Sequence, residues 1–97
     1  MAKKEIKLNE IVEKKLLAPS VTMNKLYVPD IAKKVKAGQF IVIRANDMAE
    51  RIPLTVADFD RKKGTITIIF QEVGASTHKL AALEEGDSYL DVVGPLG

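Results

Sequence analysis

Apolar and polar residues alternate along most of this chain with the period of two that is typical of half-buried β-strands. The clearest alternation places Ile66, Ile68 and Phe70 on one face of a strand. Residues 6–8 alternate in the same way, and so do residues 21–28, where Val21 and Met23 are followed by Leu26 and Val28 in shifted phase. The pattern therefore predicts a protein built mainly from β-strands.

Three further strands are expected at 40–43, 52–57 and 89–93. The first of these is apolar throughout, which indicates a strand covered on both faces. Ile11 and Val12 break the alternation, as a β-bulge or a bend would. Short strands at intervals of 8–12 residues favour a small closed barrel over a sandwich of two large sheets.

One helix is expected from Ser76 to Leu83, ended by Gly86. Asp30 is a candidate N-cap for a short turn at 31–35. Gly64 is expected to supply the positive φ of a hairpin turn.

Composition narrows the function classes. The 97 residues suffice for one domain, and the net charge of +2 comes from basic residues spread along the chain. The absence of cysteine excludes disulfides, thiolate metal sites and iron–sulfur ligation within this segment. No signal peptide and no run of about 18 apolar residues is visible, so we expect a cytoplasmic protein without a membrane partner.

Conventional catalytic sets are missing. His78 has no cysteine to pair with, and it is either a surface residue or a ligand contact. Glu84 and Glu85 are adjacent, so their side chains do not face each other on a helix and indicate a solvated helix end. We therefore expect no catalytic residue and no metal ligand in this chain, and the remaining candidates are binding residues.

The segment that begins at Arg51 is the first candidate for binding. A guanidinium can donate two hydrogen bonds to a phosphate, although Arg51 could instead pair with Glu50 or Asp47 on the surface. Pro53 removes a strand donor, which suits an edge strand or a ligand-facing strand.

The next two residues of this segment have two interpretations each. Leu54 could contact a flat ring or fill the core, and Thr55 could donate to a ring nitrogen or be an ordinary strand residue.

The second candidate is the start of the expected helix. Gly74 allows a sharp turn, and Ser76 and Thr77 then begin a helix whose first amides lack intrahelical partners. Such amides attract phosphate, although Ser76 could also be an N-cap that needs no ligand. Phe70 and Gln71 end the preceding strand and could flank a ribityl or ribose group, unless Phe70 belongs to the core.

Four segments in one order resemble the ferredoxin–NADP reductase superfamily: Gly38-Gln39-Phe40, Arg51-Ile52-Pro53-Leu54-Thr55, Gly74-Ala75-Ser76-Thr77 and Gly94-Pro95-Leu96-Gly97. The pattern is most similar to electron-transfer subunits of dihydroorotate dehydrogenase and to the small subunit of NADH-dependent reduced ferredoxin:NADP oxidoreductase (sulfide dehydrogenase). The resemblance implies an all-β fold, a six-stranded antiparallel Greek-key barrel with one short helix after the fifth strand, that binds FAD.

The resemblance also implies roles for particular segments. Residues 52–55 would lie along the isoalloxazine and the upper diphosphate, residues 69–71 beside the ribityl and ribose, and Ser76 and Thr77 at the diphosphate. The expected cofactor-binding residues, on both grounds, are Arg51, Ile52, Pro53, Leu54, Thr55, Ile69, Phe70, Gln71, Gly74, Ser76 and Thr77.

One position departs from the family pattern. Many members place arginine directly before the Pro-Leu/Ile-Ser/Thr element, but here Ile52 occupies that place and Arg51 precedes it. On a strand, a shift of one residue moves a side chain to the opposite face.

Members of the family continue into a nicotinamide-nucleotide domain and a cysteine-rich iron–sulfur segment. The resemblance therefore implies that residues 1–97 are an FAD-binding barrel domain and a fragment of a longer NAD(P)H-dependent oxidoreductase subunit. That subunit would work with a larger catalytic subunit and reach NAD(P)H and an iron–sulfur cluster through parts missing here. We expect the fragment alone to be inactive, and to self-associate through the apolar face that its missing neighbour would cover.

The alternative is a small barrel that serves as an interaction module without flavin, docking a partner subunit or binding RNA. RNA-binding barrels need a basic face and aromatic stacking platforms, whereas aromatic residues make up 5% of this chain. We therefore expect no nucleic-acid partner.

Overall fold

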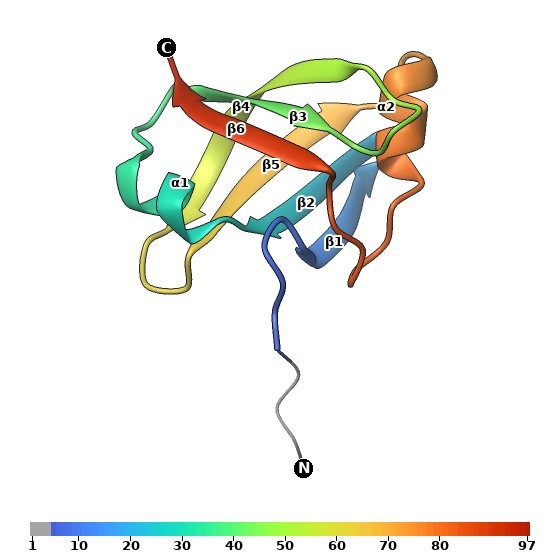
Figure 1. Cartoon of the computed structure of the whole chain (residues 1–97). Helices are drawn as coiled ribbons and strands as arrows, with labels where there is room; N and C mark the ends of the chain where they lie inside the picture. The colour runs from blue at the N-terminus through green and yellow to red at the C-terminus, as the bar shows by residue number, and fades with distance from the viewer. Residues whose placement is uncertain (1–4) are drawn as a thin grey trace.

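A computed structural model describes residues 5–97, which form one six-stranded antiparallel sheet and two short helices (Figure 1). The elements are β1 (Ile11–Ala18), β2 (Val21–Tyr27), α1 (Pro29–Lys34), β3 (Phe40–Arg44), β4 (Arg51–Asp60), β5 (Thr65–Gln71), α2 (Ala75–Ala81) and β6 (Asp91–Leu96). The expected all-β class with six antiparallel strands is confirmed, and the expectation of a single helix is wrong.

The strand order is β1-β2-β5-β4-β3-β6. Strands β3, β4 and β5 follow one another as antiparallel neighbours, and β6 returns to lie beside β3, which is a Greek-key connection. The start of β1 and the segment before it meet the segment that precedes β6: Ile11 N donates to Asp87 O at 2.8 Å, and Tyr89 N donates to Asn9 O at 3.0 Å. The sheet therefore curls until its two edges approach each other.

The core follows from the alternation read in the sequence. Ile66, Ile68 and Phe70 all point inward and are buried, as are Ile41 and Ile43 of β3. Burial of each such side chain stabilises the fold by about 1.5–3 kcal/mol. Phe40, Val42 and Arg44 on the other face of β3 are half-buried, so this strand is only partly covered there.

The strand expected at 6–8 is wrong. Residues 5–8 form no strand, and Leu8 is 64% exposed. Alternation alone does not create a strand, because a strand also needs a neighbour, and the pairing of β1 with β2 begins only at Ile11 opposite Leu26. The irregularity expected near Ile11 is present as a register shift between Ile11 and Glu13.

The helix that the sequence did not predict, α1, begins at Pro29. Proline suits the first helical position, because the missing N–H has no intrahelical partner there. Val28 is the N-cap residue, so the expected capping role of Asp30 is wrong, and Asp30 lies in the first turn. The second helix, α2, ends two residues before the expected Leu83.

The last strand is also shifted from its expected position. It covers Asp91–Leu96 instead of 89–93, so Gly94 and Pro95 belong to the strand. Proline is tolerated because β6 lies at the edge of the sheet. Gly94 has a φ of +155°, and a Cβ there would lie 2.9 Å from Cγ2 of Ile41.

Gly64 has the positive φ expected for the β4–β5 hairpin, at +72°.

Candidate functional site

β4 divides its pairing between two neighbours. Residues 51–55 pair with β3, whereas only residues 56–60 pair with β5. The last residues of β5, from Ile69 to Gln71, pair with β2 instead. The two central strands therefore separate beyond Val56 and Ile68, toward the end of the sheet where α2 follows β5 (Figure 1).

A groove of about 520 Å³ lies at this end of the sheet, in the size range of small-molecule sites. One wall comes from the β3–β4 loop and the start of β4, and the other from the start of α2. The lining residues are Met48, Glu50, Arg51, Ile52, Pro53, Val73, Gly74, Ala75, Ser76, Thr77 and Lys79. Figure 1 shows the β3–β4 loop running beside α2.

The groove brings together six of the expected site residues, namely Arg51, Ile52, Pro53, Gly74, Ser76 and Thr77. The other five lie outside its lining. Thr55, Ile69 and Gln71 are exposed on the adjacent strands, whereas Leu54 packs against the core and Phe70 is only 4% exposed. The core interpretation of Leu54 and Phe70 is therefore the one that the structure supports.

Five lining residues are not among the expected site residues: Met48, Glu50, Val73, Ala75 and Lys79. Lys79 could have been found, because it follows Ser76 by three residues and thus shares its side of the helix. Met48 could not, because only the folded β3–β4 loop carries it to α2.

Arg51 faces away from Ile52 and pairs with a residue that sequence reasoning did not consider. Its Nη1 lies 3.5 Å from Oδ2 of Asp91 on β6. Arg51 and Asp91 both lie opposite Arg44 in the registers of β4, β3 and β6, so the three side chains share one face. The suggested pairing with Glu50 or Asp47 is therefore wrong. The Arg51 side chain is 57% exposed, so solvent screens this ion pair.

The N-terminal end of α2 is exposed at Gly74 and open to a ligand. Gly74 is the N-cap residue and lies at a bend, as expected, but its φ of −165° is an extended conformation that any residue adopts. A Cβ added to Gly74 would meet no atom within 4 Å. Neither backbone strain nor packing requires glycine at this position, and close approach of a ligand to the backbone is a remaining reason for it.

The Thr77 hydroxyl holds the backbone at the start of α2 in place. Its Oγ1 accepts from Val73 N at 2.8 Å and Gly74 N at 3.0 Å, and donates to Gly74 O at 3.1 Å. The hydroxyl is thus occupied within the protein. The amides of residues 75–77 have no acceptor within residues 5–97, since the helical hydrogen bonds begin with His78 N on Gly74 O at 2.8 Å.

The donor set of the groove fits a ligand with a central diphosphate. Unpaired helix amides, the Ser76 hydroxyl and the Lys79 ammonium provide donors on the α2 wall. The outward surfaces of β4 and β5 add the exposed Thr55 hydroxyl and the Gln71 amide. A flavin ring needs such a mixture of extended backbone, apolar contact and polar side chains.

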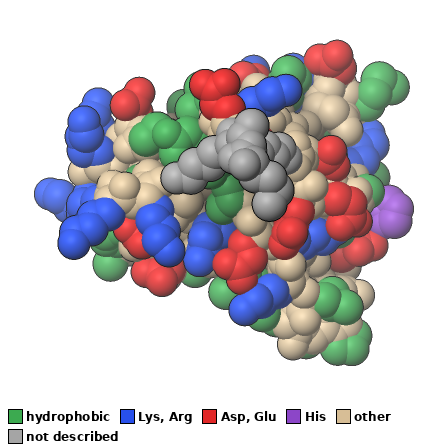
Figure 2. All heavy atoms as spheres, turned by 90° about the horizontal axis from the view of Figure 1, so that it is seen from below, with side chains coloured by type: hydrophobic (Ala, Val, Ile, Leu, Met, Phe, Trp, Pro, Cys, Tyr) green, Lys and Arg blue, Asp and Glu red, His purple; other side chains and the backbone are tan. Residues whose placement is uncertain are grey.

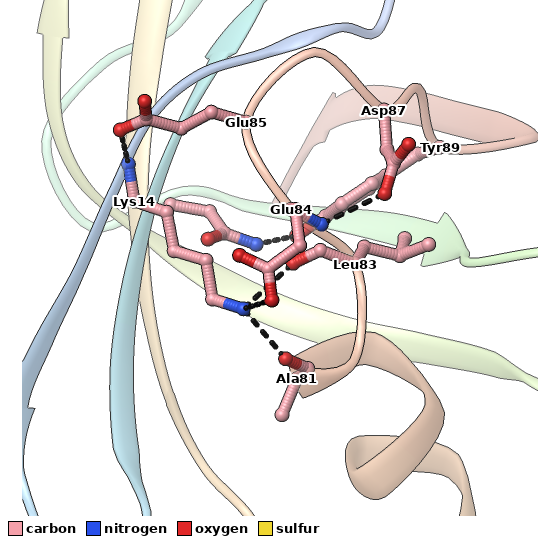
Figure 3. Close-up of polar contacts among 8 residues, drawn as sticks. Lys14, Ala81, Leu83, Glu84, Glu85, Asp87 and Tyr89 are labelled. Carbon is pink, nitrogen blue, oxygen red and sulfur yellow. Dashed lines mark hydrogen bonds and ion pairs between the residues drawn. The ribbon is translucent and has the colours of Figure 1, made fainter.

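Figure 3 shows how the far end of α2 is held. Lys14 of β1 donates from Nζ to Ala81 O and Leu83 O, both at 2.8 Å, and to Oε1 of Glu84 at 3.1 Å. Its backbone N donates to Oε2 of Glu85 at 2.9 Å. Lys14 thereby satisfies carbonyls that a helix C-terminus leaves open. Glu84 and Glu85 contact β1 but remain exposed, so the expected solvated helix end is confirmed.

Two further polar groups are structural. Nδ2 of Asn24 donates to the buried hydroxyl of Tyr89 at 2.6 Å, and burial raises the pKa of Tyr89, so this hydroxyl stays protonated. His78 is exposed, and its Nδ1 lies 2.7 Å from Oε2 of Glu72. It does not line the groove, in agreement with a surface histidine. Neither group takes part in the groove.

Between residues 5 and 97, no cluster of three or more His, Asp or Glu side chains has a metal-binding arrangement. Neither α1 nor α2, the helices of this described part, is long and apolar enough to span a membrane. Figure 2 shows both basic and acidic side chains across the face seen from below, so this face has no uninterrupted basic surface.

Curated relatives match nearly the whole chain. A protein from Clostridium beijerinckii, described only as an uncharacterized protein in the adh 3' region, is 51% identical over 88 residues, 91% of this chain and 30% of its own length. A Thermotoga maritima homologue of the electron transfer subunit of dihydroorotate dehydrogenase B (NAD(+)) is 47% identical over 93% of this chain and 32% of its own. The chain thus spans about a third of these relatives. No protein-family model matches it.

Solved structures agree with these relatives. The structure of NADH-dependent reduced ferredoxin–NADP oxidoreductase, from a study of flavin-based electron bifurcation, superposes with a TM-score of 0.91 at 46% identity, over 94% of this chain and 34% of the other. The cytochrome b5 reductase domain of Ulva prolifera nitrate reductase superposes with a TM-score of 0.72 at 22% identity, which shows the fold alone. The chain belongs to the ferredoxin reductase-like superfamily and corresponds to its FAD-binding domain.

Proposed function

We propose that this chain binds FAD in the groove between β4 and α2, as part of an electron-transfer subunit. The observation that carries the proposal is the groove itself, in which the split of β4 from β5 meets the unpaired amides of α2. The 46–47% identity to a subunit homologue and to a solved oxidoreductase supports it. Bound flavin would supply the redox chemistry, and the protein would hold and orient it.

Each part of the groove has a role in this proposal. The amides of residues 75–77 and the Ser76 hydroxyl bind the diphosphate, while the Thr77 hydroxyl keeps the helix start in place. Pro53 and Thr55 lie along the isoalloxazine on β4. Ile69 and Gln71, exposed at the end of β5, contact the ribityl and ribose. Leu54 and Phe70 support these strands from the core.

The proposed whole protein is larger than this chain. We propose a cytoplasmic, NAD(P)H-dependent oxidoreductase in which residues 1–97 form one domain of a longer subunit. That subunit would pass electrons between NAD(P)H, flavin and iron–sulfur or ferredoxin partners, together with a larger catalytic subunit. The relatives' threefold greater length is the support for the additional parts.

A titration of the purified chain with FAD, followed by flavin fluorescence and by calorimetry, tests the proposal. We expect saturable binding of FAD, much weaker binding of FMN and weakest binding of riboflavin, because only FAD carries the diphosphate. Equal affinity for FAD and riboflavin would exclude the proposed diphosphate contacts. No binding of any flavin, with a salt-sensitive shift of RNA on the same protein, would favour the interaction-module alternative.

A further inference from the structure

Two basic side chains line the groove, and their electrostatic situations differ. The guanidinium of Arg51 is paired with Asp91 across β3. The ammonium of Lys79 donates to the main-chain carbonyl of Met48, and within residues 5–97 it has no carboxylate at ion-pair distance. Lys79 is therefore the lining cation whose charge the described protein does not neutralise.

The position of Lys79 is fixed from both walls of the groove. Its backbone belongs to α2, and its partner Met48 belongs to the β3–β4 loop. An ammonium has three donors, and this hydrogen bond uses one of them. The carbonyl thus holds the charge at the edge of the groove and leaves two donors for an anion, which lowers the entropic cost of binding.

The β3–β4 loop does not depend on Lys79 alone. Arg44 donates from Nε to Ala49 O and from Nη2 to Asp47 O, both at 3.0 Å. Met48 N also donates to Oδ1 of Asn46 at 2.9 Å. Because the loop keeps these bonds without Lys79, a substitution of Lys79 removes the charge without releasing the loop.

We propose that Lys79 is the cation that binds the diphosphate in this groove, while Arg51 stays with Asp91 as a positioning residue of the sheet. The inference rests on the proposed FAD function and adds a residue to it. An ammonium–phosphate hydrogen bond is about twice as strong as a bond between neutral groups, so the two remaining donors of Lys79 favour a phosphate over water.

Inorganic pyrophosphate and FAD are the two probes for the test. The full chain is compared with Lys79→Met, with Arg51→Met, and with Lys33→Met, which loses the same charge on α1 away from the groove. Binding is followed by amide NMR shifts for pyrophosphate and by flavin fluorescence for FAD, and the amide spectrum also shows whether each variant is folded. We expect Lys79→Met to weaken both ligands about tenfold, and the other two variants to change affinity less than about twofold.

The wild-type chain supplies a measurement that needs no variant. Addition of pyrophosphate should move the Lys79 side-chain resonances and the Met48 amide, and this reading decides the matter if Lys79→Met does not fold. Unchanged affinity in Lys79→Met, a loss confined to Arg51→Met, or no binding of either probe would overturn the inference. If pyrophosphate binds and needs Lys79 but FAD does not bind, the proposed function is refuted and the assignment of Lys79 as an anion-binding residue is retained.

Discussion

The two helices of this protein are similar in length but differ in what their ends bind. At the C-terminal end they are alike, because a basic side chain from a distant segment satisfies the last carbonyls. Arg61 donates to Ala32 O and Val35 O, both at 2.9 Å, at the end of α1. Lys14 donates to Ala81 O and Leu83 O at the end of α2.

The N-terminal ends differ. α1 begins with Pro29, which has no N–H to satisfy, and the helix buries Ile31 and Ala32 in the core. α2 begins at Ala75 after the N-cap Gly74, which has no side chain, and its first residues line the groove. Figure 1 places the two helices at opposite ends of the sheet. The comparison indicates that α1 completes the fold, whereas α2 is anchored at one end and left open to a ligand at the other.

Truncation of the side chain that anchors each helix should have the largest effect. Leu80 is fully buried under α2 and Ile31 is buried under α1. Leu80→Ala and Ile31→Ala should each lower the free energy of unfolding by about 2–4 kcal/mol, measured by urea denaturation. Under conditions where both variants remain folded, only Leu80→Ala should weaken FAD binding. Equal loss of FAD affinity in the two variants would remove the functional difference between the helices.

Removal of the cations at the helix C-termini should have the next largest effect. The Lys14 side chain is 19% exposed, and Lys14→Met should cost about 1–2 kcal/mol, because it leaves two carbonyls and Glu84 without this donor. Arg61→Met should cost a similar amount and also removes the stacking of Arg61 on the Phe59 ring.

Lys15→Met is the matched control for these two variants. It is a neighbouring lysine on β1 whose side chain is 64% exposed, and its change in stability should stay within about 0.5 kcal/mol. A loss in Lys15→Met as large as that in Lys14→Met would show that the helix-end contacts contribute little.

A serine at Gly74 should separate stability from binding. The extended φ of −165° and the open space around Cβ permit serine, which is a good N-cap residue. The free energy of unfolding should stay the same or rise by up to about 1 kcal/mol. The new hydroxyl would occupy an amide that the diphosphate needs, so FAD affinity should fall about tenfold, which corresponds to about 1.4 kcal/mol. Retained affinity would show that these amides do not bind the ligand.

The smallest expected effect is on the pH dependence of stability, and it arises from a residue outside both helices. Hydrogen bonds from Lys15 and Lys25 hold the pKa of Glu13 on β1 below its usual value. A carboxylate with a lowered folded-state pKa stabilises the fold above its unfolded pKa, and this stabilisation is lost as the pH falls through the lowered value. Glu13→Gln should therefore slightly flatten the decrease of melting temperature between neutral and acidic pH. An unchanged profile would show that these exposed pairs contribute nothing measurable.

Much of the sheet was predictable from local pattern. β2, β4 and β5 were expected as strands from their patterns, and the Gly64 turn was expected from its glycine. In β2 the alternation gave the strand but not the buried face, because Thr22, Asn24 and Leu26 are buried whereas Val21 is only half-buried. Residues 6–8 show that alternation is not sufficient for a strand, because they alternate but have no partner strand. α1 was expected only as a short turn at 31–35, although Pro29 suits the first position of a helix.

For the site, the sequence by itself determined the donor chemistry at two places, the segment 51–55 and the helix start at 74–77. Only the tertiary structure decided which of these donors share one groove. A strand turns alternate side chains to opposite faces, so Arg51 reaches Asp91 while Leu54 enters the core. The partner of Lys79 is 31 residues away in the chain, and local pattern carries no information about a contact that loop and helix make only after the sheet has curled.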